Sequence, residues 1–309
     1  MTATLPDRDD AQSSPGVALV ERLLKGSARQ SYDPEVDLDW DAPEVPGLWW
    51  MQPERMSLYG TPLWDRMTDE QRLELSKHEV ASIASVGLWF EIVLMQLLLK
   101  DVYRSDATAP RTHYLLTEIA DECRHSTMFG KAIGRFGVPA YGPRKDAVQL
   151  GRLVPAVLRG PGAYAATLLG EEPVDRWQRD AMNDERLQPL FRMVARIHVL
   201  EEARHVSFAR DELEKGLVGI SKRELKWHQF VAAQAAYVTM RSLVNPKVYA
   251  AVGIDPREGR HAALSNPNYR ESIAWMGEKV VPYLDEVGMI PKSGRIRKTW
   301  QASFLLRRD

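Results

Sequence analysis

The sequence predicts an all-α fold in which a four-helix bundle forms the core, with additional helices and an extended N-terminal arm. Three observations support this fold class. From residue 68 onward, nearly every segment places apolar residues at helical spacing. Proline and glycine fall in the gaps between long stretches of good helix formers. No segment of useful length alternates apolar and polar residues as a β-strand does.

The N-terminal part differs from the bundle in composition. Residues 1–15 are rich in Asp, Ser and Thr, which predicts a disordered N-terminus. A short helical pattern follows, and we expect order to begin near Gly16. From Tyr32 to Pro62 the chain is rich in proline and tryptophan, so we expect an extended arm held against the bundle by its aromatic side chains. Residues 16–309 are then expected to form a single all-α domain.

Periodicity and punctuation predict six helices after the arm. Helices of this length bury their apolar stripes against one another, so they should pack as an antiparallel bundle. The expected helices cover residues 68–102, 110–136, 145–182 with a break at Pro173, 186–215, 221–244 and 267–286.

Composition and charge exclude several classes of protein. The formal net charge is −1 and no cluster of Lys and Arg is interleaved with aromatic residues, which argues against a nucleic-acid binder and favours a small-molecule partner. The single cysteine, Cys123, excludes an internal disulfide, and the polar start of the chain lacks a secretory pattern, so the expected location is cytoplasmic. The apolar run from Val86 to Leu99 is too short to cross a bilayer and contains Glu91, which indicates a buried helix.

Two near-identical pentapeptides contain candidate metal-binding residues. Residues 121–125 and 201–205 both read acid-Glu-x-Arg-His. The Glu and the His of each motif are three positions apart, so they share one face of a helix, a single turn apart. His198 lies four residues before the second Glu and extends the same stripe. Because both stripes are otherwise apolar, these groups should face the core, where a bound cation would offset the cost of burying them.

A two-metal site in a bundle also needs a carboxylate from each of the other two helices, as in ferritin-like di-iron proteins. Glu91 is the only acid in the apolar run of the first helix. In the third helix, Glu171 shares its stripe with apolar residues, whereas Glu172 lies beside other charged residues, so we favour Glu171. The predicted core is therefore ferritin-like. Its predicted metal ligands are Glu91, Glu122, His125, Glu171, His198, Glu202 and His205.

The ligand set indicates which metals would bind. Four carboxylates would balance the charge of two divalent cations, with the imidazoles neutral. Oxygen and nitrogen donors without thiolate suit two iron ions (Fe2+/Fe3+), and manganese or zinc could substitute. We assign no catalytic residue beyond these ligands.

Residues around the motifs carry weaker expectations. Asp121 and Glu201 are either hydrogen-bond acceptors for the histidine ligands or unrelated to them. Glu118 is expected to be solvated or hydrogen-bonded rather than a ligand, and Cys123 to be a packed thiol. The remaining groups should form ion pairs on the outer face (Arg124 and Arg204) or have surface or structural roles (His78, His113, His228 and His261).

Over roughly residues 65–290, the order and spacing of these residues resemble the p-aminobenzoate N-oxygenase family, the AurF-like arylamine oxygenases. His198 is the distinguishing feature, because ferritin-like enzymes in general use two histidines and four carboxylates. The resemblance implies oxidation of an arylamine to a hydroxylamine, nitroso or nitro product, with dioxygen and an external electron donor. The family's arginine that holds the substrate carboxylate has no clear match, and Arg270 and Lys279 are only nearby basic residues.

Two other functions are compatible with the same ligands. A di-iron hydroxylase or desaturase would act on C–H bonds, and a metal-storage bundle would have no catalytic activity. The primary hypothesis is a monooxygenase that acts on the nitrogen of a small-molecule amine. Neither a nucleic acid nor a membrane is expected as a partner, and a homodimer is the default assembly.

Overall fold

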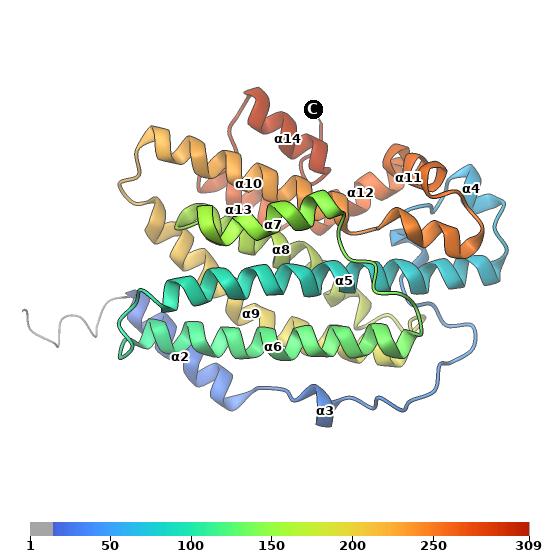
Figure 1. Ribbon diagram of the computed structural model, residues 1–309, viewed down its shortest axis with the longest axis horizontal. Coiled ribbons are helices and arrows are strands. Elements are labelled where there is room, and N and C mark those ends of the chain that lie inside the picture. Colours follow the sequence, from blue (N-terminus) through green and yellow to red (C-terminus); the bar gives the residue numbers. More distant parts are fainter. Residues whose placement is uncertain (1–14, 309) are drawn as a thin grey trace, which may run out of the picture.

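Four long helices lie side by side at the centre of the molecule and form the predicted bundle (Figure 1). They are α5 (Asp69–Val102), α6 (Pro110–Phe136), α8 (Pro161–Ala181) and α9 (Pro189–Leu217). The computed structural model describes residues 15–308, and within that range it contains helices and one isolated β-bridge but no strand. α5 packs on α6 and α8 packs on α9, and contacts from α6 to α9 and from α5 to α8 close the bundle.

Local sequence signals determine where these helices begin and end. α5 starts after a capping box, in which the side chains of Thr68 and Gln71 each accept a hydrogen bond from the other residue's backbone N–H. α6, α8 and α9 each have proline near the start of the first turn, where its missing N–H costs nothing. α6 ends at Gly137, whose φ of 70° is a left-handed conformation that glycine adopts readily.

Four of the expected helices are confirmed within three residues at each end, namely 68–102, 110–136, 186–215 and 221–244; the last of these is α10 (Lys222–Ser242).

The expected helix at 145–182 is instead two helices, α7 (Lys145–Val157) and α8, and the predicted break at Pro173 is wrong. The chain turns at Gly160, which has a φ of 57°, and Pro161 starts the next helix. Pro173 lies inside α8 and is buried. A proline there removes one backbone hydrogen bond, but α8 packs against neighbouring helices that keep it helical through that position.

The expected helix at 267–286 also divides in two, into α12 (Pro267–Met276) and α13 (Val280–Glu286). The sequence did not predict three further elements. Of these, η2 packs on α5 and α14 packs on α10. These elements are η2 (Pro246–Val252), α11 (Pro256–Ser265) and α14 (Gly294–Ser303).

The N-terminal arm follows the bundle in an extended path with short helical turns (Figure 1). Before the arm, α2 (Pro15–Arg29) packs on α6 and α9. The short turns in the arm are α3 (Pro34–Asp37), η1 (Pro53–Arg55) and α4 (Pro62–Asp65).

Aromatic side chains attach this arm, as expected. Trp49 stacks on Trp64 with ring centroids 6.2 Å apart, and Trp50 lies 4.4 Å from Phe136 of α6. The disordered stretch predicted at residues 1–15 lies outside the described residues, except for Pro15 at the start of α2.

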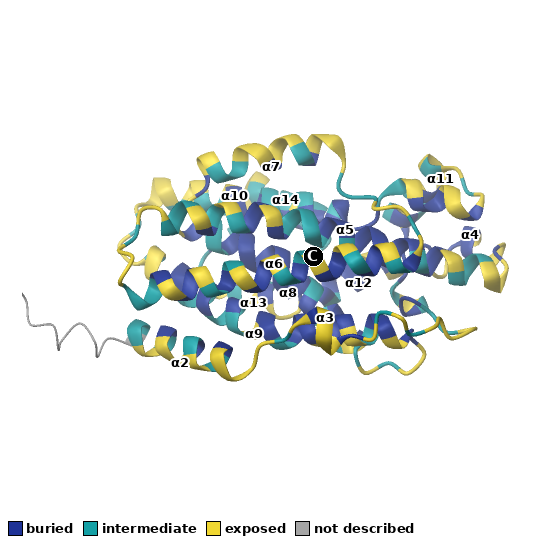
Figure 2. Cartoon of the chain, turned by 60° about the horizontal axis from the view of Figure 1, so that its bottom comes forward, coloured by how far each residue is buried: buried dark blue, intermediate teal, exposed yellow. Residues whose placement is uncertain are grey.

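Within residues 15–308, α5 alone has the length and apolar composition of a membrane span. In this structure it lies within the bundle, and 44% of its most apolar stretch is buried inside the protein. Figure 2 shows the buried residues concentrated where the helices face one another. Because a core helix and a membrane span share this composition, the cytoplasmic location stays a prediction.

Candidate metal centre

All seven predicted ligands lie together inside the bundle, and each is at most 3% exposed. Every bundle helix contributes: Glu91 from α5, Glu122 and His125 from α6, Glu171 from α8, and His198, Glu202 and His205 from α9. Within overlapping groups of three, the donor atoms lie within 4.8 Å of one another. The overlap joins all seven residues into one cluster.

The two Glu-x-x-His motifs face each other across α6 and α9. His125 Nδ1 lies 3.3 Å from Glu122 of its own motif and 3.2 Å from Glu202 of the other. His205 Nδ1 lies 3.0 Å from Glu122 and 3.1 Å from Glu202. Each of these carboxylates therefore reaches both imidazoles, which is the arrangement expected of ligands shared by two metal ions.

His198 extends the cluster toward α5 and α8. Its Nε2 lies 3.5 Å from Glu202 and 3.7 Å from Glu91, and its Nδ1 lies 2.6 Å from Oε1 of Gln178. Because an amide oxygen only accepts hydrogen bonds, Nδ1 carries the proton and Nε2 directs its lone pair into the cluster. Gln178 was not predicted from the sequence, although it lies two turns after Glu171 on the same face of α8.

Asp121 and Glu201 orient the other two imidazoles. Glu201 Oε2 lies 2.8 Å from Nε2 of His125, and Asp121 Oδ2 lies 3.2 Å from Nε2 of His205. Each acid therefore accepts a hydrogen bond from the histidine of the other motif. Nε2 carries a proton, so Nδ1, which lies beside the shared carboxylates, is the nitrogen of each ring that could bind a metal. Of the two alternatives left open by the sequence, this geometry supports the acceptor role.

Arg124 and Arg204 form the ion pairs expected of them. Arg124 pairs with Asp121, and Nη2 of Arg204 lies 3.5 Å from Asp121 and 3.6 Å from Glu201. Burial alone would raise the pKa of Asp121, but the hydrogen bond from His205 and the charge of Arg124 outweigh it, and the pKa is lowered. The acids behind the histidines thus have their own positive partners.

Glu118 is not solvated, so this part of the expectation is wrong. The residue is 1% exposed, its Oε2 has no hydrogen-bond partner within the described residues, and it lies in one group with Glu122 and His205. Burial raises its pKa to about 8, and the charge of Glu122 acts in the same direction. Glu118 is therefore an eighth potential donor. Its position one turn before Glu122 fitted both readings of the sequence, and only helix packing buries it beside Glu122 and His205.

Glu171, rather than Glu172, faces the cluster, as favoured from the sequence. Glu171 lies in one group with His198 and Glu202. Glu172 instead pairs with Arg210, with Nη2 and Oε2 2.5 Å apart.

The acids of the cluster repel one another. Burial raises the pKa of Glu171 well above its usual value, and the charge of Glu202 raises it further. Burial also raises the pKa of Glu91. Burial by itself would raise the pKa of Glu202, but His205 and His198 outweigh it and hold that pKa well below its usual value. A cation in the cluster would relieve the repulsion.

Unpartnered atoms inside the cluster fit a metal pair. Oε1 of Glu171, Oε2 of Glu202 and Nε2 of His198 are buried and have no hydrogen-bond partner within the described residues. Buried polar atoms are nearly always bonded, so this concentration of free lone pairs is unusual. All are oxygen or nitrogen donors without thiolate, which suits iron or manganese. The residues present therefore fit a pair of metal ions.

Cys123 is exposed, so the prediction of a packed thiol is wrong. It follows Glu122 directly, and one step along a helix turns the side chain by about 100°, away from the inward stripe. Its Sγ lies 3.5 Å from Sδ of Met95 on the neighbouring helix α5.

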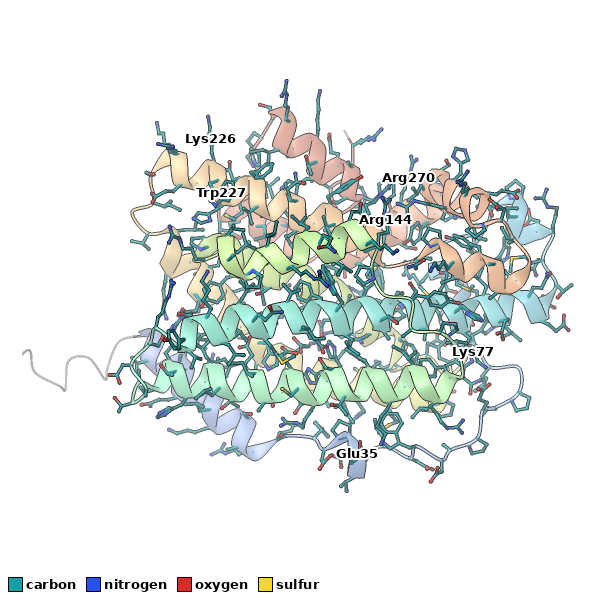
Figure 3. All side chains as sticks on the ribbon, viewed as in Figure 1. Glu35, Lys77, Arg144, Lys226, Trp227 and Arg270 are labelled. Atoms are coloured by element: carbon teal, nitrogen blue, oxygen red, sulfur yellow. The ribbon has the colours of Figure 1, made fainter. Side chains whose placement is uncertain are left out.

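The remaining histidines and basic candidates lie apart from the cluster. His78 is buried and bonds Tyr141 and Glu74, so its role is structural. Arg270 donates to the carbonyl of Leu264 and lies among the C-terminal helices (Figure 3). The others are His113, which contacts the Ala107 carbonyl, His228, which accepts from the Gly162 N–H, and His261 and Lys279, which are exposed.

Residues 16–288 match the family model described as p-aminobenzoate N-oxygenase AurF. An uncharacterised protein of Mycobacterium tuberculosis (strain CDC 1551 / Oshkosh) is 32% identical over 263 residues, which cover 81% of this chain and 76% of that protein. An uncharacterised protein of Mycobacterium bovis is 31% identical with the same coverage.

Similar solved structures include mutants of an R2-like ligand-binding oxidase. One with a non-activated Mn/Mn cofactor has a TM-score of 0.47 and 12% identity, and the match covers 88% of this chain and 98% of that one. Another, with an anaerobically reconstituted Mn/Fe cofactor, has a TM-score of 0.48 and 12% identity, covering 88% and 99%.

Proposed function

This chain belongs to the p-aminobenzoate N-oxygenase (AurF) family and is a dimetal oxidoreductase, and on that premise we propose that it oxidises the nitrogen of a small-molecule amine. The proposed metals are two iron ions, and the proposed partners are dioxygen and an external electron donor. A homodimer is the proposed assembly. Conversion of an amine to a hydroxylamine with one dioxygen consumes two electrons and two protons and releases water, so the donor is required by the balance of the reaction.

The observation that carries this proposal is the third histidine in the cluster. His198 presents Nε2 to Glu91 and Glu202, in addition to the two Glu-x-x-His motifs. A neutral imidazole adds a donor without adding negative charge, so the cluster binds two cations with less excess charge than a set of carboxylates would. We therefore propose that Glu91, Glu122, His125, Glu171, His198, Glu202 and His205 hold the two ions, with Glu118 as a further donor.

When bound, a pair of iron ions supplies the redox chemistry with dioxygen. The chain itself supplies orientation and a dry interior. Glu201 and Asp121 hold the Nε2 protons of His125 and His205, and Gln178 holds the Nδ1 proton of His198. Each imidazole therefore keeps one fixed tautomer, with its unprotonated nitrogen toward the cluster.

The test combines metal analysis with a product assay. The purified protein, loaded with iron under reducing conditions, should contain two irons per chain and convert arylamines to hydroxylamine, nitroso or nitro products when dioxygen and a reductant are supplied. Hydroxylation or desaturation of C–H substrates with inert amines would overturn the proposal. So would an iron content far above two per chain without turnover, which would indicate storage.

A further inference from the structure

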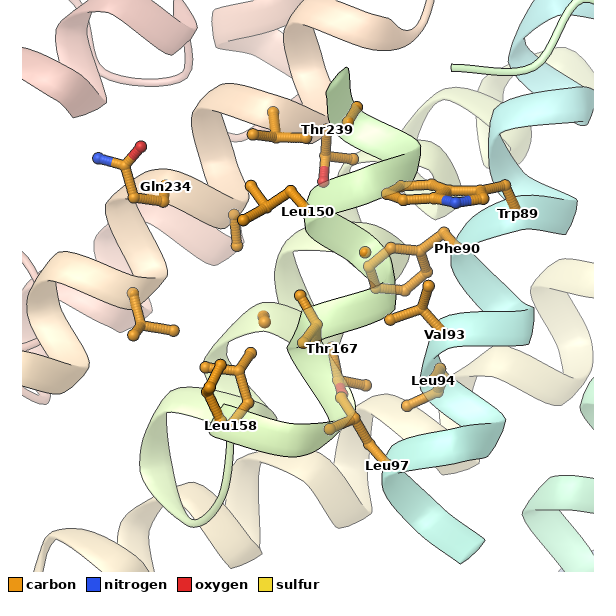
Figure 4. Close-up of a pocket in the computed structure, with 18 of the residues that line it drawn as sticks. Trp89, Phe90, Val93, Leu94, Leu97, Leu150, Leu158, Thr167, Gln234 and Thr239 are labelled. Atoms are coloured by element: carbon orange, nitrogen blue, oxygen red, sulfur yellow. The ribbon is translucent and has the colours of Figure 1, made fainter. Parts of the chain in front are cut away.

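An apolar cavity of about 290 Å3 lies between α5, α7, α8 and α10. Figure 4 shows its lining, with Trp89 and Phe90 of α5 on the right, Gln234 of α10 on the left, and Leu150 of α7 between them. Ligand cavities in proteins start at about this size and are mostly apolar, with a few polar groups for orientation.

Two residues that line this cavity lie next to proposed ligands on the same helices. Phe90 lines the cavity and directly precedes Glu91, and Thr167 lines it one turn before Glu171. The ring of Phe90 packs directly on the backbone of Gly170, because a Cβ added at Gly170 would lie 1.8 Å from Cζ of the ring. Phe90 therefore lines the cavity and also packs where α5 and α8 lead directly into Glu91 and Glu171.

The lining favours an uncharged ligand. It contains four aromatic side chains, and none of its side chains is charged. Its polar side chains are Thr167, Gln234 and Thr239, and the Thr167 hydroxyl already donates to the Ala163 carbonyl. Transfer of a carboxylate or an ammonium from water into such a site is strongly unfavourable, whereas a neutral arylamine keeps its nitrogen lone pair and stacks on aromatic rings.

From this geometry, and resting on the proposed function, we propose that the cavity is the substrate site and binds an uncharged, apolar arylamine. The charged p-aminobenzoate should not bind there. Phe90 is the positioning residue that separates the bound ring from the metal centre. This assigns the substrate class of this chain from the charge of its own lining.

An adjoining cavity of about 400 Å3 contains charged residues, of which the half-buried Arg111 and Lys100 are already paired, whereas Arg104 and Arg159 are exposed. The Arg111 guanidinium bonds Asp101, Glu212 and the Tyr164 hydroxyl. Lys100 donates to the carbonyls of Pro155 and Leu158 at the end of α7. A substrate carboxylate placed beside Arg111 or Lys100 would have to displace these existing partners.

Calorimetric titration of the iron-loaded protein with 4-butylaniline and with 4-aminobenzoate tests this proposal. The neutral amine should bind at least tenfold more tightly than the carboxylated one. Ala235→Phe, which fills the cavity from α10, should weaken 4-butylaniline binding at least tenfold, and Ala147→Leu fills it from α7 if the first variant does not fold. Gln234→Arg, which adds a cation to the lining, should give measurable binding of 4-aminobenzoate.

Gly87→Ala is the matched control, because its new methyl group would point into a separate cavity of about 20 Å3, 3.7 Å from Phe129. It should leave the affinity for 4-butylaniline unchanged. Tighter binding of 4-aminobenzoate to the native protein, or full affinity for 4-butylaniline in both filled variants, would overturn the cavity assignment. Binding that is lost in the filled variants without any N-oxidised product from the native protein would keep the assignment and reject the proposed function. N-oxidation that persists at the native rate in both filled variants would keep the proposed function and reject the cavity as the substrate site.

Discussion

Oε2 of Glu201 on α9 lies 2.8 Å from Nε2 of His125 on α6. The acid belongs to one motif and the histidine to the other, and Asp121 and His205 repeat the relationship in the opposite direction at 3.2 Å. Each proposed metal-binding imidazole is therefore oriented by the helix that faces it. Metal affinity should depend on residues that do not contact the metal.

Glu201→Gln should lower the affinity for iron by about 10–100-fold while the fold is retained, because a neutral amide holds the Nε2 proton of His125 less strongly. Competition with a chelator measures the affinity. Glu185→Gln, at an exposed position, is the control and should bind iron as the native protein does. Native affinity in Glu201→Gln would rule out this orienting role.

His198→Ala should reduce the iron content from about two per chain to about one, and Glu122→Ala should nearly abolish binding, because Glu122 reaches both motif histidines. Iron analysis after gel filtration measures both. His113→Ala removes an exposed histidine and should leave the content unchanged. Two irons and full activity in both ligand variants would contradict the proposed set.

Removal of the metal should lower the melting temperature at neutral pH by roughly 5–10 °C, since a ligand at a thousand times its Kd adds about 4 kcal/mol of stability. The unneutralised acids around Glu171 and Glu202 also repel one another in the metal-free protein. Calorimetry of metal-free and iron-loaded samples measures the shift. Equal melting temperatures would show that the cluster does not bind the metal tightly.

Glu79→Gln should remove a pH dependence of stability that lies away from the metal centre. Burial raises the pKa of Glu79 from 4.5 to about 7, although Ser57 hydrogen-bonds the carboxylate. A raised folded-state pKa favours the folded protein below pH 4.5, and this contribution is lost as the pH rises through 7. The native protein should therefore lose about 3 kcal/mol relative to the variant between pH 4.5 and 7. Denaturant titrations at several pH values measure this, and Glu21→Gln, at an exposed site, should follow the native profile.

Gly170→Ala should destabilise the protein by about 1–3 kcal/mol, because the new Cβ would collide with the Phe90 ring. The matched change Gly134→Ala, in a part of α6 where a Cβ meets nothing within 4 Å, should instead be neutral or stabilise the protein by up to about 1 kcal/mol. Thermal unfolding of both variants measures the difference. Equal stability of the two would contradict the close approach of Phe90 to Gly170.

Helix ends could be predicted only where the signal is local. The capping box at Thr68 and the glycine after Phe136 act within a few residues, and both ends were predicted correctly. The break was predicted at Pro173 but lies at Gly160, because the effect of a proline inside a helix depends on what packs around it. The extra helix α14 was missed, since its main support is a distant partner, α10.

Spacing along a helix is determined by the chain itself, so the pairing of Glu122 with His125 and of Glu202 with His205 on common faces followed from the sequence alone. The face on which a polar residue meets another helix is a property of packing. Only the tertiary structure therefore buried Glu118, exposed Cys123 and brought Gln178 to His198. The same holds for the crossing of Glu201 to His125, because side chains 76 residues apart in sequence meet only when α6 and α9 are packed together.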